Sequence, residues 1–523
     1  MSSPIDNSDP PADLFKVVVG DRIGLTEIQK SALPPPWVRW AAFLLIALLG
    51  LLLRLPQLGE RPMHTDEAVN AYIIGQLLAG QPFTYDPQDR HGPALAVFAL
   101  PLARMQGARA FSDLSESELR LTTALAGCMT ILFFGAAVEM FRFVPCLVAA
   151  LLFAAAPLPV YYDRYFIHES VFVAATFGLI LAGWRAWQRR SAPLAALAAA
   201  CAALMLATKE TAVLHFVALV IAALIYWLWN LRGQDSVGLW RPKSALAAAA
   251  TFLIFSVLLF TWFGRNWKAP AALLRAAPIF LARAGGEGHQ GPVWYYAKLL
   301  IGGWSGGVIL VLACIGFLLT ARKRGPSAYN FLAFYAVLIA IVYSLIPYKT
   351  PWLALNFWLP IALFAGVAFE SLWRMPAKSS AVQFANCAVC ILVGVAVAAL
   401  IFHDTRQRVF LHPADEVNPY AYAHTSEDLL GLPAEIERLA HQNAIAAPRI
   451  AVIASDPWPL PWYLRHIAEV GFWQPGQQPG QADFYITSTE AADQYAELLK
   501  NFRPEFFGTR PGVLILLWSA APK

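Results

Sequence analysis

Two adjacent carboxylates, Asp66 and Glu67, follow the first long apolar run of the chain, within His-Thr-Asp-Glu-Ala. Carboxylates at the end of a membrane span are costly to desolvate, so they lie in the interface or in a water-filled cavity, where such groups are functional candidates. A carboxylate there can take a proton as a general base. The pair could instead cap the helix expected over 68–78 by accepting its free amide protons. This stretch alone leaves both interpretations open.

A second polar stretch, from 159 to 170, carries Asp163, Arg164 and Glu169 among three tyrosines. If it is helical, Tyr165 and Glu169 lie one turn apart. An aromatic belt with an Asp163–Arg164 surface pair would also explain most of its composition. Glu169, which opens an apolar helix, exceeds what a belt requires.

Four more short motifs place cations and histidines between apolar runs. Lys209 and Glu210 follow the fifth run, and this lysine either reaches to the interface or binds a phosphate as a compact charge. His91, in His-Gly-Pro, either faces the first carboxylates or belongs to an ordinary turn. His289 lies in a glycine-rich loop that suits a mobile cover or a plain connector.

The fourth motif, Pro-Tyr-Lys-Thr-Pro-Trp, contains Tyr348, Lys349 and Trp352. Its two prolines restrict the backbone on either side of the lysine. The motif therefore predicts a rigidly placed cation at the mouth of a span.

Composition sets the class of protein. Of 523 residues, 58% are hydrophobic and 14% are charged, against about 25% charged residues in soluble domains. This indicates a polytopic membrane protein. The net charge of +5 is spread over short loops, which argues against nucleic acid as a partner. The six cysteines lie within or at the ends of apolar runs, which predicts buried thiols rather than disulfides or a zinc site.

Eleven apolar runs are long enough to cross the hydrocarbon layer of a membrane. Residues 1–36 before them form a polar tail, expected in the cytoplasm, and 94–105 is too short to span and is expected to be an interfacial or re-entrant helix. The transmembrane region is expected over 37–402. Its predicted spans are 37–55, 119–139, 145–161, 170–187, 192–208, 212–231, 244–264, 294–320, 328–346, 352–372 and 381–402.

Orientation follows from the short loops, since Lys and Arg are retained on the cytoplasmic side. Alternate loops carry almost only these residues, among them Arg142, Arg185 and Arg374. Every candidate stretch described above falls on the opposite side. With an odd number of spans, so does the remainder, 403–523.

That remainder is large enough for one small α/β domain outside the membrane. Strands are expected over 449–453, 484–486 and 513–518, and helices over 430–442 and 489–499. Two segments dense in polar and aromatic groups, 418–425 and 456–465, suit carbohydrate or peptide binding, but docking onto the membrane region is the favoured interpretation.

Outer-face acids, outer-face cations and an apolar bundle together suit one chemistry. A lipid-phosphate sugar donor has an apolar tail for the bundle and an anionic leaving group for the cations. Its sugar carbon is open to attack by an acceptor hydroxyl once a carboxylate takes the proton. The acceptor could be a glycan, a lipid or a protein.

The ordered motifs also resemble a known family. Asp66-Glu67, the Tyr-Tyr-Asp-Arg-Tyr-Phe-Ile-His-Glu stretch and Thr-Lys-Glu look like those of GT-C membrane glycosyltransferases of the protein mannosyltransferase and aminoarabinose transferase type. His-Gly-Pro, Gly-His-Gln-Gly-Pro-Val-Trp-Tyr-Tyr, Tyr-Lys-Thr-Pro-Trp, Asn-Pro-Tyr-Ala-Tyr-Ala-His-Thr and Trp-Pro-Leu-Pro-Trp-Tyr-Leu-Arg are similar to the flippase-activity-associated branch of that superfamily. The resemblance runs from about residue 50 to 470.

What this resemblance implies is an inverting transferase of the cytoplasmic (inner) membrane that uses a polyprenyl-phosphate-linked sugar at a site facing outward. By position, Asp66 would be the general base, Glu67 a supporting acid and Glu169 a carboxylate that orients acceptor or metal. Relatives usually carry Ser-Arg where this chain has Asp163-Arg164, so the acid could divert the arginine from phosphate. The residues expected to bind the donor phosphate are Arg164, Lys209, Lys349 and His289, and those expected to bind substrate are His91, Glu210, Tyr348 and Trp352.

No cofactor is required by any spacing. Metal use varies in the superfamily, and a divalent Mg or Mn ion would take Asp66 and Glu169 as ligands, with His91 or His289 beside them.

Two other classes of function stay open at this stage. A lipid-linked sugar flippase or transporter would place its charges near mid-membrane on broken helices, often with an internal repeat. A non-catalytic assembly protein could share the fold without any activity.

Overall fold

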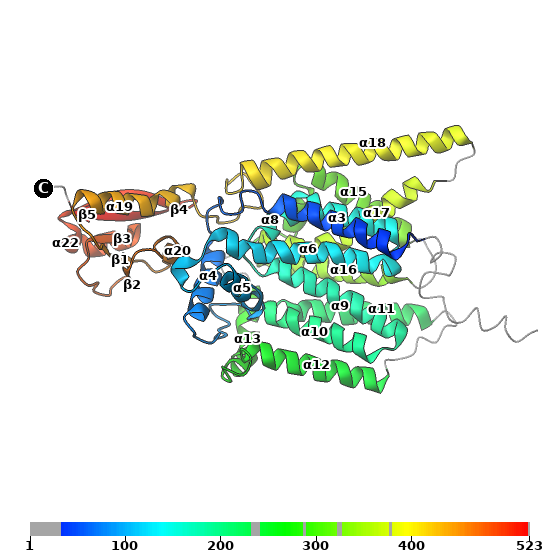
Figure 1. The fold of residues 1–523 in the computed structure, drawn as a ribbon, viewed down its shortest axis with the longest axis horizontal. Helices are drawn as coiled ribbons and strands as arrows, with labels where there is room; N and C mark the ends of the chain where they lie inside the picture. Colours follow the sequence, from blue (N-terminus) through cyan, green and yellow to red (C-terminus); the bar gives the residue numbers. More distant parts are fainter. Residues whose placement is uncertain (1–32, 232–240, 286–288, 322–326, 376–378, 521–523) are drawn as a thin grey trace, which may run out of the picture.

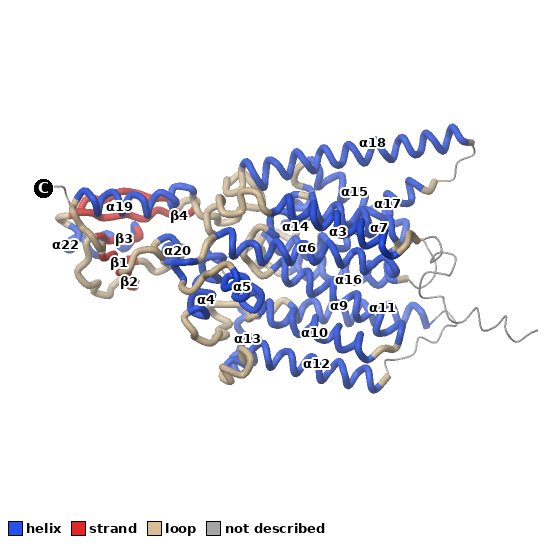
Figure 2. The backbone as a smooth tube through the Cα atoms, viewed as in Figure 1, coloured by secondary structure: helices blue, strands red, loops and turns tan. Residues whose placement is uncertain are grey.

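A bundle of apolar helices makes up most of the molecule, and a small α/β domain projects from one end of it (Figure 1). The computed structural model describes residues 33–231, 241–285, 289–321, 327–375 and 379–520. The prediction for the tail 1–36 therefore lies almost wholly outside the described residues. Within them, strands are confined to the projecting domain, and loops gather between it and the bundle (Figure 2).

The first half of the bundle contains a short pair of helices, α4 and α5, that does not cross it. Both lie at the end of the bundle that carries the projecting domain, the site end (Figure 1). The helices up to residue 231 are α3 (Pro36–Arg54), α4 (Thr65–Leu78), α5 (Ala94–Met105), α6 (Glu116–Phe141), α7 (Phe143–Ala155), α8 (Pro157–Asp163), α9 (Glu169–Arg189), α10 (Ala192–Thr208) and α11 (Ala212–Leu231), with the 3-10 turn η1 (Phe111–Asp113) before α6.

The second half contains the long peripheral helices α12 and α18. Large apolar side chains are exposed on α12, α18 and α3, as expected for surfaces that face lipid. The elements are α12 (Pro242–Phe260), α13 (Ala269–Ala284), α14 (Tyr295–Ile301), α15 (Trp304–Ala321), α16 (Ala328–Leu345), η2 (Pro351–Ala354), α17 (Leu355–Trp373), α18 (Ser380–Thr405) and the π-helical turn η3 (Arg406–Leu411).

The predicted spans agree with apolar helices in place, but eleven is more than the nine, or ten with one bent pair, that are long enough to cross a membrane within the described residues. The other two predicted spans correspond to α7 and α8, which bend by 58° at Ala156, and to the 17-residue apolar helix α10. The predicted run 294–320 is broken at Gly302 and Gly303 into α14 and α15. Helix α5 matches the expected short helix 94–105.

Ion pairs join the loops at the end opposite the site end. Arg142 lies 2.8 Å from Glu370, and Arg185 and Arg189 both approach Glu139. These contacts place three of the predicted cytoplasmic stretches side by side. The six cysteines are free thiols, of which Cys314 is exposed.

The projecting domain is a five-stranded mixed sheet in the order β2-β1-β3-β5-β4. Strand β1 pairs in parallel with β2 and β3, and β5 pairs antiparallel with β3 and β4. Apolar residues of α19 cover one face of the sheet, and the short helices α21 and α22 cover the other. The elements are η4 (Glu427–Gly431), α19 (Leu432–Gln442), β1 (Arg449–Ile453), α20 (Leu460–Tyr463), β2 (Glu469–Trp473), β3 (Phe484–Ser488), α21 (Thr489–Ala492), η5 (Asp493–Tyr495), α22 (Ala496–Leu499), β4 (Phe502–Arg510) and β5 (Val513–Ala520).

The two aromatic segments of the tail dock onto the site end, as the sequence predicts. The Thr425 hydroxyl donates to the carbonyl of Met63 at 2.6 Å, and the Tyr463 hydroxyl accepts from the Met63 amide at 2.9 Å. The Trp462 indole donates to Glu116 at 2.7 Å. The residues that precede the acid pair are thus held from both tail segments.

Candidate active site

Asp66 lies in the first turn of α4, and its side chain is exposed. His64 is the N-cap of this helix, and its Nδ1 accepts the Asp66 amide proton at 3.0 Å. The Asp66 carboxylate has no hydrogen bond or ion pair to any described residue, while its charge acts on His64 and His289. It is therefore a free carboxylate held at a fixed place by the cap of its helix.

Glu67, its neighbour, is fully buried. It completes the capping box by accepting from the His64 amide at 3.1 Å, and it accepts two N–H groups of Arg120 at 2.8 Å each. The Phe166 amide also donates to it at 2.8 Å. Burial raises the pKa of Glu67, but the Arg120 guanidinium outweighs this and brings the pKa to about 2. The capping interpretation is thus confirmed for Glu67, whose buried carboxylate fixes the start of α4.

The loop between α3 and α4 is fixed by two arginines from other elements. Arg120 of α6 donates to the carbonyls of residues 58, 61 and 62. Arg164, after α8, donates to those of residues 54, 56 and 57. Because five carbonyls of this irregular loop and that of Arg54, the last residue of α3, have guanidinium donors, the entry into α4 has a defined path.

The predicted Asp163–Arg164 pair does not form. Asp163 instead accepts from Arg54 at 2.7 Å, and both side chains are buried. Arg164 is occupied by backbone carbonyls, so its neighbouring acid does not hold it. Tyr165 and Glu169 do not share a helix either, because α8 ends at Asp163 and α9 begins at Glu169.

Aromatic and imidazole groups form a wall beside Asp66. The His64 Nε2–H donates to the Tyr422 carbonyl at 3.1 Å, since its Nδ1 already accepts a proton. The Tyr422 hydroxyl hydrogen-bonds to His289, whose ring also packs against Tyr348. The ring of Trp352 lies 5.9 Å from that of His64. Burial lowers the pKa of both His64 and His289, so both are neutral at pH 7.

The loop that carries His289 is paired with the loop that carries Tyr348. The Lys349 amide donates to the His289 carbonyl at 2.8 Å, and the Gly291 amide donates to the Pro347 carbonyl at 3.1 Å. The Lys349 ammonium group is buried against the C-terminus of α16, where it donates to the carbonyls of residues 343, 344 and 346. This lysine is thus rigidly placed, as predicted, with its charge directed to backbone carbonyls.

A second polar cluster lies between α9 and α10. Lys209 forms an ion pair with Glu169. Glu210 accepts from Tyr85 at 2.8 Å and contacts His91 Nδ1 at 2.7 Å. Burial raises the pKa of Glu210, but His91 and the two hydrogen bonds outweigh it, and the net pKa lies below its ordinary value. The carboxylate is therefore ionised and orients the His91 ring.

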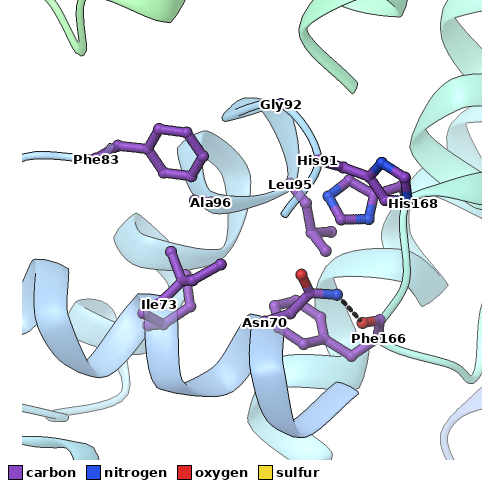
Figure 3. Close-up of a pocket in the computed structure, with 10 residues that line it drawn as sticks. Asn70, Ile73, Phe83, His91, Gly92, Leu95, Ala96, Phe166 and His168 are labelled. Carbon is purple, nitrogen blue, oxygen red and sulfur yellow. Dashed lines mark hydrogen bonds between the residues drawn. The ribbon is translucent and has the colours of Figure 1, made fainter. Parts of the chain in front are cut away.

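A small pocket lies beside the second cluster, between α4 and the loop of His91 (Figure 3). Asn70 lines it one helical turn after Asp66, on the same face of α4, and donates to the Phe166 carbonyl at 3.1 Å. The rings of His91 and His168 lie side by side on the opposite wall, with centroids 5.0 Å apart. Burial lowers the pKa of His168 well below its ordinary value. The remaining lining is mostly apolar: Ile73, Ile74, Phe83, Gly92, Leu95, Ala96 and Phe166.

Comparison with known proteins agrees with this architecture. Neither a family model nor a curated protein matches the chain. Among solved structures it is similar to ArnT from Cupriavidus metallidurans bound to undecaprenyl phosphate, with a TM-score of 0.60 and 16% identity over 92% of this chain and 98% of that one. Archaeoglobus fulgidus AglB, an archaeal oligosaccharyltransferase solved with an inhibitory peptide and a dolichol-phosphate, gives a TM-score of 0.53 and 13% identity over 93% and 74%. The arabinofuranosyltransferase AftD from Mycobacteria gives 0.50 and 13% over 95% and 40%.

The chain has the GT-C fold. The predicted fold class, a polytopic helical membrane region with a small α/β domain, is thereby confirmed. Because the ArnT likeness covers nearly the whole of both chains, it includes the tail domain as well as the bundle.

On this GT-C fold, the predicted site residues separate into groups. Asp66 shares its wall with His289, Tyr348 and Trp352. The groups of Glu169, Lys209, Glu210 and His91 form the second cluster, and Lys349 and Arg164 are bound to backbone carbonyls. Four residues of this candidate site were not predicted from the sequence. The one signal for any of them was Arg120, an arginine within an apolar run. The missed residues are His64, Arg120, His168 and Tyr422.

The two carboxylates expected to bind a metal ion do not fit that role. Glu169 is paired with Lys209, whereas Asp66 belongs to the other group. Within the described residues, no three His, Cys, Asp or Glu side chains are gathered as a metal site would require. An A. fulgidus AglB structure was solved in complex with Zn and sulfate, which concerns that protein.

Proposed function

We propose that the chain is an inverting glycosyltransferase that moves a sugar from a polyprenyl-phosphate donor to an acceptor hydroxyl. The observation that supports it most is the exposed carboxylate of Asp66, which has no ion pair or hydrogen bond to a described residue, at the site end of a GT-C fold. The similar ArnT structure holds undecaprenyl phosphate, which favours a lipid-phosphate donor. We place the site end outside the cytoplasmic membrane, because the Arg-rich loops lie at the other end.

Asp66 acts as the general base in this proposal. Its carboxylate takes the proton of the acceptor hydroxyl as the hydroxyl oxygen attacks the anomeric carbon of the sugar. The bond from that carbon to the phosphate oxygen breaks on the opposite face, and the electron pair leaves with the phosphate. One new carbon–oxygen bond replaces one old bond, and the configuration at carbon inverts.

His91 and Lys209 receive the leaving phosphate. The Glu210 carboxylate accepts from His91 Nδ1–H, so Nε2 donates to a phosphate oxygen when His91 is the imidazolium. Lys209 brings a compact positive charge, which it shares with Glu169. Glu169 then positions the lysine.

The wall of His289, Tyr348, Trp352 and Tyr422 suits the sugar and the acceptor. Flat aromatic faces with hydroxyl and imidazole edges offer both apolar contact and hydrogen bonds. We leave the acceptor as a glycan, lipid or protein hydroxyl.

The test is transfer in proteoliposomes with a panel of polyprenyl-phosphate sugars, using Asp66→Asn. Asparagine keeps the shape but cannot take the proton, so we expect transfer to fall at least about 100-fold with unchanged thermal stability. The matched control is Asp89→Asn, an exposed carboxylate that pairs with Arg90 on the site end and should retain full activity.

Two outcomes would overturn the proposal. Full transfer by Asp66→Asn would remove the base assignment. Movement of lipid-linked sugar across the vesicle membrane by wild-type protein, with no transfer product from any donor, would establish a transporter instead.

A further inference from the structure

Positive charge exceeds negative charge beside the loop that leads to Asp66. The buried arginines Arg61, Arg120 and Arg164 line one small pocket there. The buried carboxylate beside them, Glu67, is already bound by Arg120 through two hydrogen bonds. Arg61 reaches the same carboxylate only at 3.8 Å. The single negative charge of Glu67 therefore faces two guanidinium groups, those of Arg120 and Arg61, and cannot balance both.

Arg164 lacks a counter-ion among the described residues. Its three hydrogen bonds go to carbonyl groups, and its guanidinium lies over the ring of Phe410. Burial, followed by the charges of Arg61 and Arg120, lowers the pKa of Arg164 to about 9, so it stays protonated at pH 7. A buried cation without an anion is costly unless a ligand supplies the charge.

Arg61 has donor capacity to spare. It donates through one terminal nitrogen to the Arg164 carbonyl at 2.7 Å, and its guanidinium lies against the rings of Tyr161 and Tyr165. Its Nε–H is buried and has no partner among the described residues. The predicted cations Lys209 and Lys349 differ in this respect, because Lys209 has Glu169 and Lys349 has three carbonyls.

The pocket opens at the edge of the lipid-facing surface. Its lining includes exposed Gln57 and Glu60 and, from the other side, Phe410 and Pro413 after α18. It begins just beyond the last residue of α3, whose outer face carries the exposed Leu45, Leu48 and Leu52. Lipid phosphate groups lie at the level where such an apolar surface ends.

We propose that this pocket binds the phosphate group of a membrane lipid through Arg61 and Arg164, with Arg120 behind them. Planar guanidinium groups match phosphate oxygens by paired N–H donors. The source is either a phospholipid of the bilayer or a polyprenyl phosphate. The proposal adds a site to the one assigned to sugar transfer and rests on the proposed function only for the second source.

The first test is a gain of binding, which avoids damage to the fold. Glu60 is exposed and is the acidic residue whose charge acts on Arg164, so Glu60→Gln should tighten binding of short-chain phosphatidylglycerol about threefold at low salt. The control is Glu427→Gln, an exposed acid of the tail domain, which should leave affinity unchanged. Equal affinity in wild type and Glu60→Gln would overturn the proposal.

The second test is a loss of binding. Arg164→Gln should weaken phosphatidylglycerol binding at least about tenfold, since a charge-assisted contact is lost, and Arg164→Lys should restore part of it. Arg109→Gln, an exposed arginine of the site end, is the matched control. If Arg164→Gln fails to fold, the Glu60→Gln result decides the matter alone. Unchanged affinity in a folded Arg164→Gln would refute the site.

The source is separated by titrating farnesyl phosphate and inorganic phosphate beside phosphatidylglycerol. Preference for farnesyl phosphate assigns the pocket to the donor or product lipid, and equal affinity for the two lipids assigns it to the bilayer. Binding of inorganic phosphate alone would contradict a lipid ligand. Because binding is measured without sugar transfer, an inactive protein that still binds would refute the proposed reaction and leave this site intact.

Discussion

Glu67→Gln is expected to destabilise the protein without touching the reacting groups. The substitution removes the charge that Arg120 binds, and it turns one acceptor oxygen into an N–H₂ group that faces donors. Glu67 accepts four hydrogen bonds, from Arg120 twice, from Phe166 and from His64. At least one of these donors loses its acceptor, and the buried guanidinium loses its counter-ion.

The magnitude follows from the pKa of the carboxyl group. A fall from 4.5 to about 2 corresponds to about 3 kcal/mol of stabilisation of the ionised form, at 1.36 kcal/mol per unit. Loss of one partner of a buried ion pair gives a similar cost of about 3–5 kcal/mol. Since the two figures agree, we expect Glu67→Gln to lower the free energy of unfolding by about 3 kcal/mol.

Glu118→Gln is the matched control. Glu118 is also the N3 residue of a capping box, at the start of α6, and accepts from the Ser115 amide at 3.1 Å. It has no ion pair with a described residue, so its substitution should cost about 1 kcal/mol or less. The difference between the two variants isolates the Arg120 pair and the Phe166 contact.

The assay is thermal unfolding of purified protein in detergent. Glu67→Gln should lower Tm by roughly 5 °C, with Glu118→Gln close to wild type. The wild-type carboxyl has a depressed pKa in the folded state, so its contribution is present above pH 4.5 and is lost as the pH falls toward 2. A Tm for Glu67→Gln equal to that of Glu118→Gln would refute a structural role.

Two further substitutions test the second cluster and the rigid lysine. In Gly92→Ala, the new Cβ would lie 2.2 Å from the Ala207 carbonyl oxygen, so we expect a loss of about 1–3 kcal/mol in stability and a fall in transfer as His91 shifts; Gly59→Ala, with no atom nearer than 3.8 Å, should change neither. Lys349→Met removes the donor to three carbonyls at the end of α16 and should lower Tm while the donor KM is unchanged. Unchanged Tm with a raised donor KM would instead make Lys349 a phosphate ligand.

The place and order of the spans could be predicted from the sequence because a membrane imposes long apolar runs on any helix that crosses it. The tail was harder to predict. Its inner strands β1, β3 and β5 were expected, whereas β2 and β4 were not. These two are the edges of the sheet, where one side has no neighbour and a polar or Pro-containing sequence is tolerated. Strand β4 contains Pro504 and Arg503.

The candidate site could be predicted only in part, because its partners are far apart in the chain. Asp66 and Glu67 were both expected to act on substrate. Neighbouring residues of a helix point in different directions, and here Asp66 is exposed and Glu67 is buried. Arg120, which binds the Glu67 carboxylate, lies 53 residues away in the sequence. No local pattern indicates that pair, nor the contact of Tyr422 with His64 across 358 residues.

Asp66 and Glu67 are neighbours, but Asp66 is exposed and Glu67 is buried and bound by Arg120. A general base must keep an oxygen free for a proton, while the loop that holds it must resist movement. Both oxygens of Glu67 accept hydrogen bonds, from Arg120, Phe166 and the helix cap, and these bonds fix the turn from which Asp66 projects. Asp66 therefore needs no stabilising contact of its own. Substitution of Asp66 should then abolish transfer with little loss of stability. Substitution of Glu67 should lower stability with a smaller direct effect on the reaction. Measured together, the two variants separate a catalytic role from a structural one.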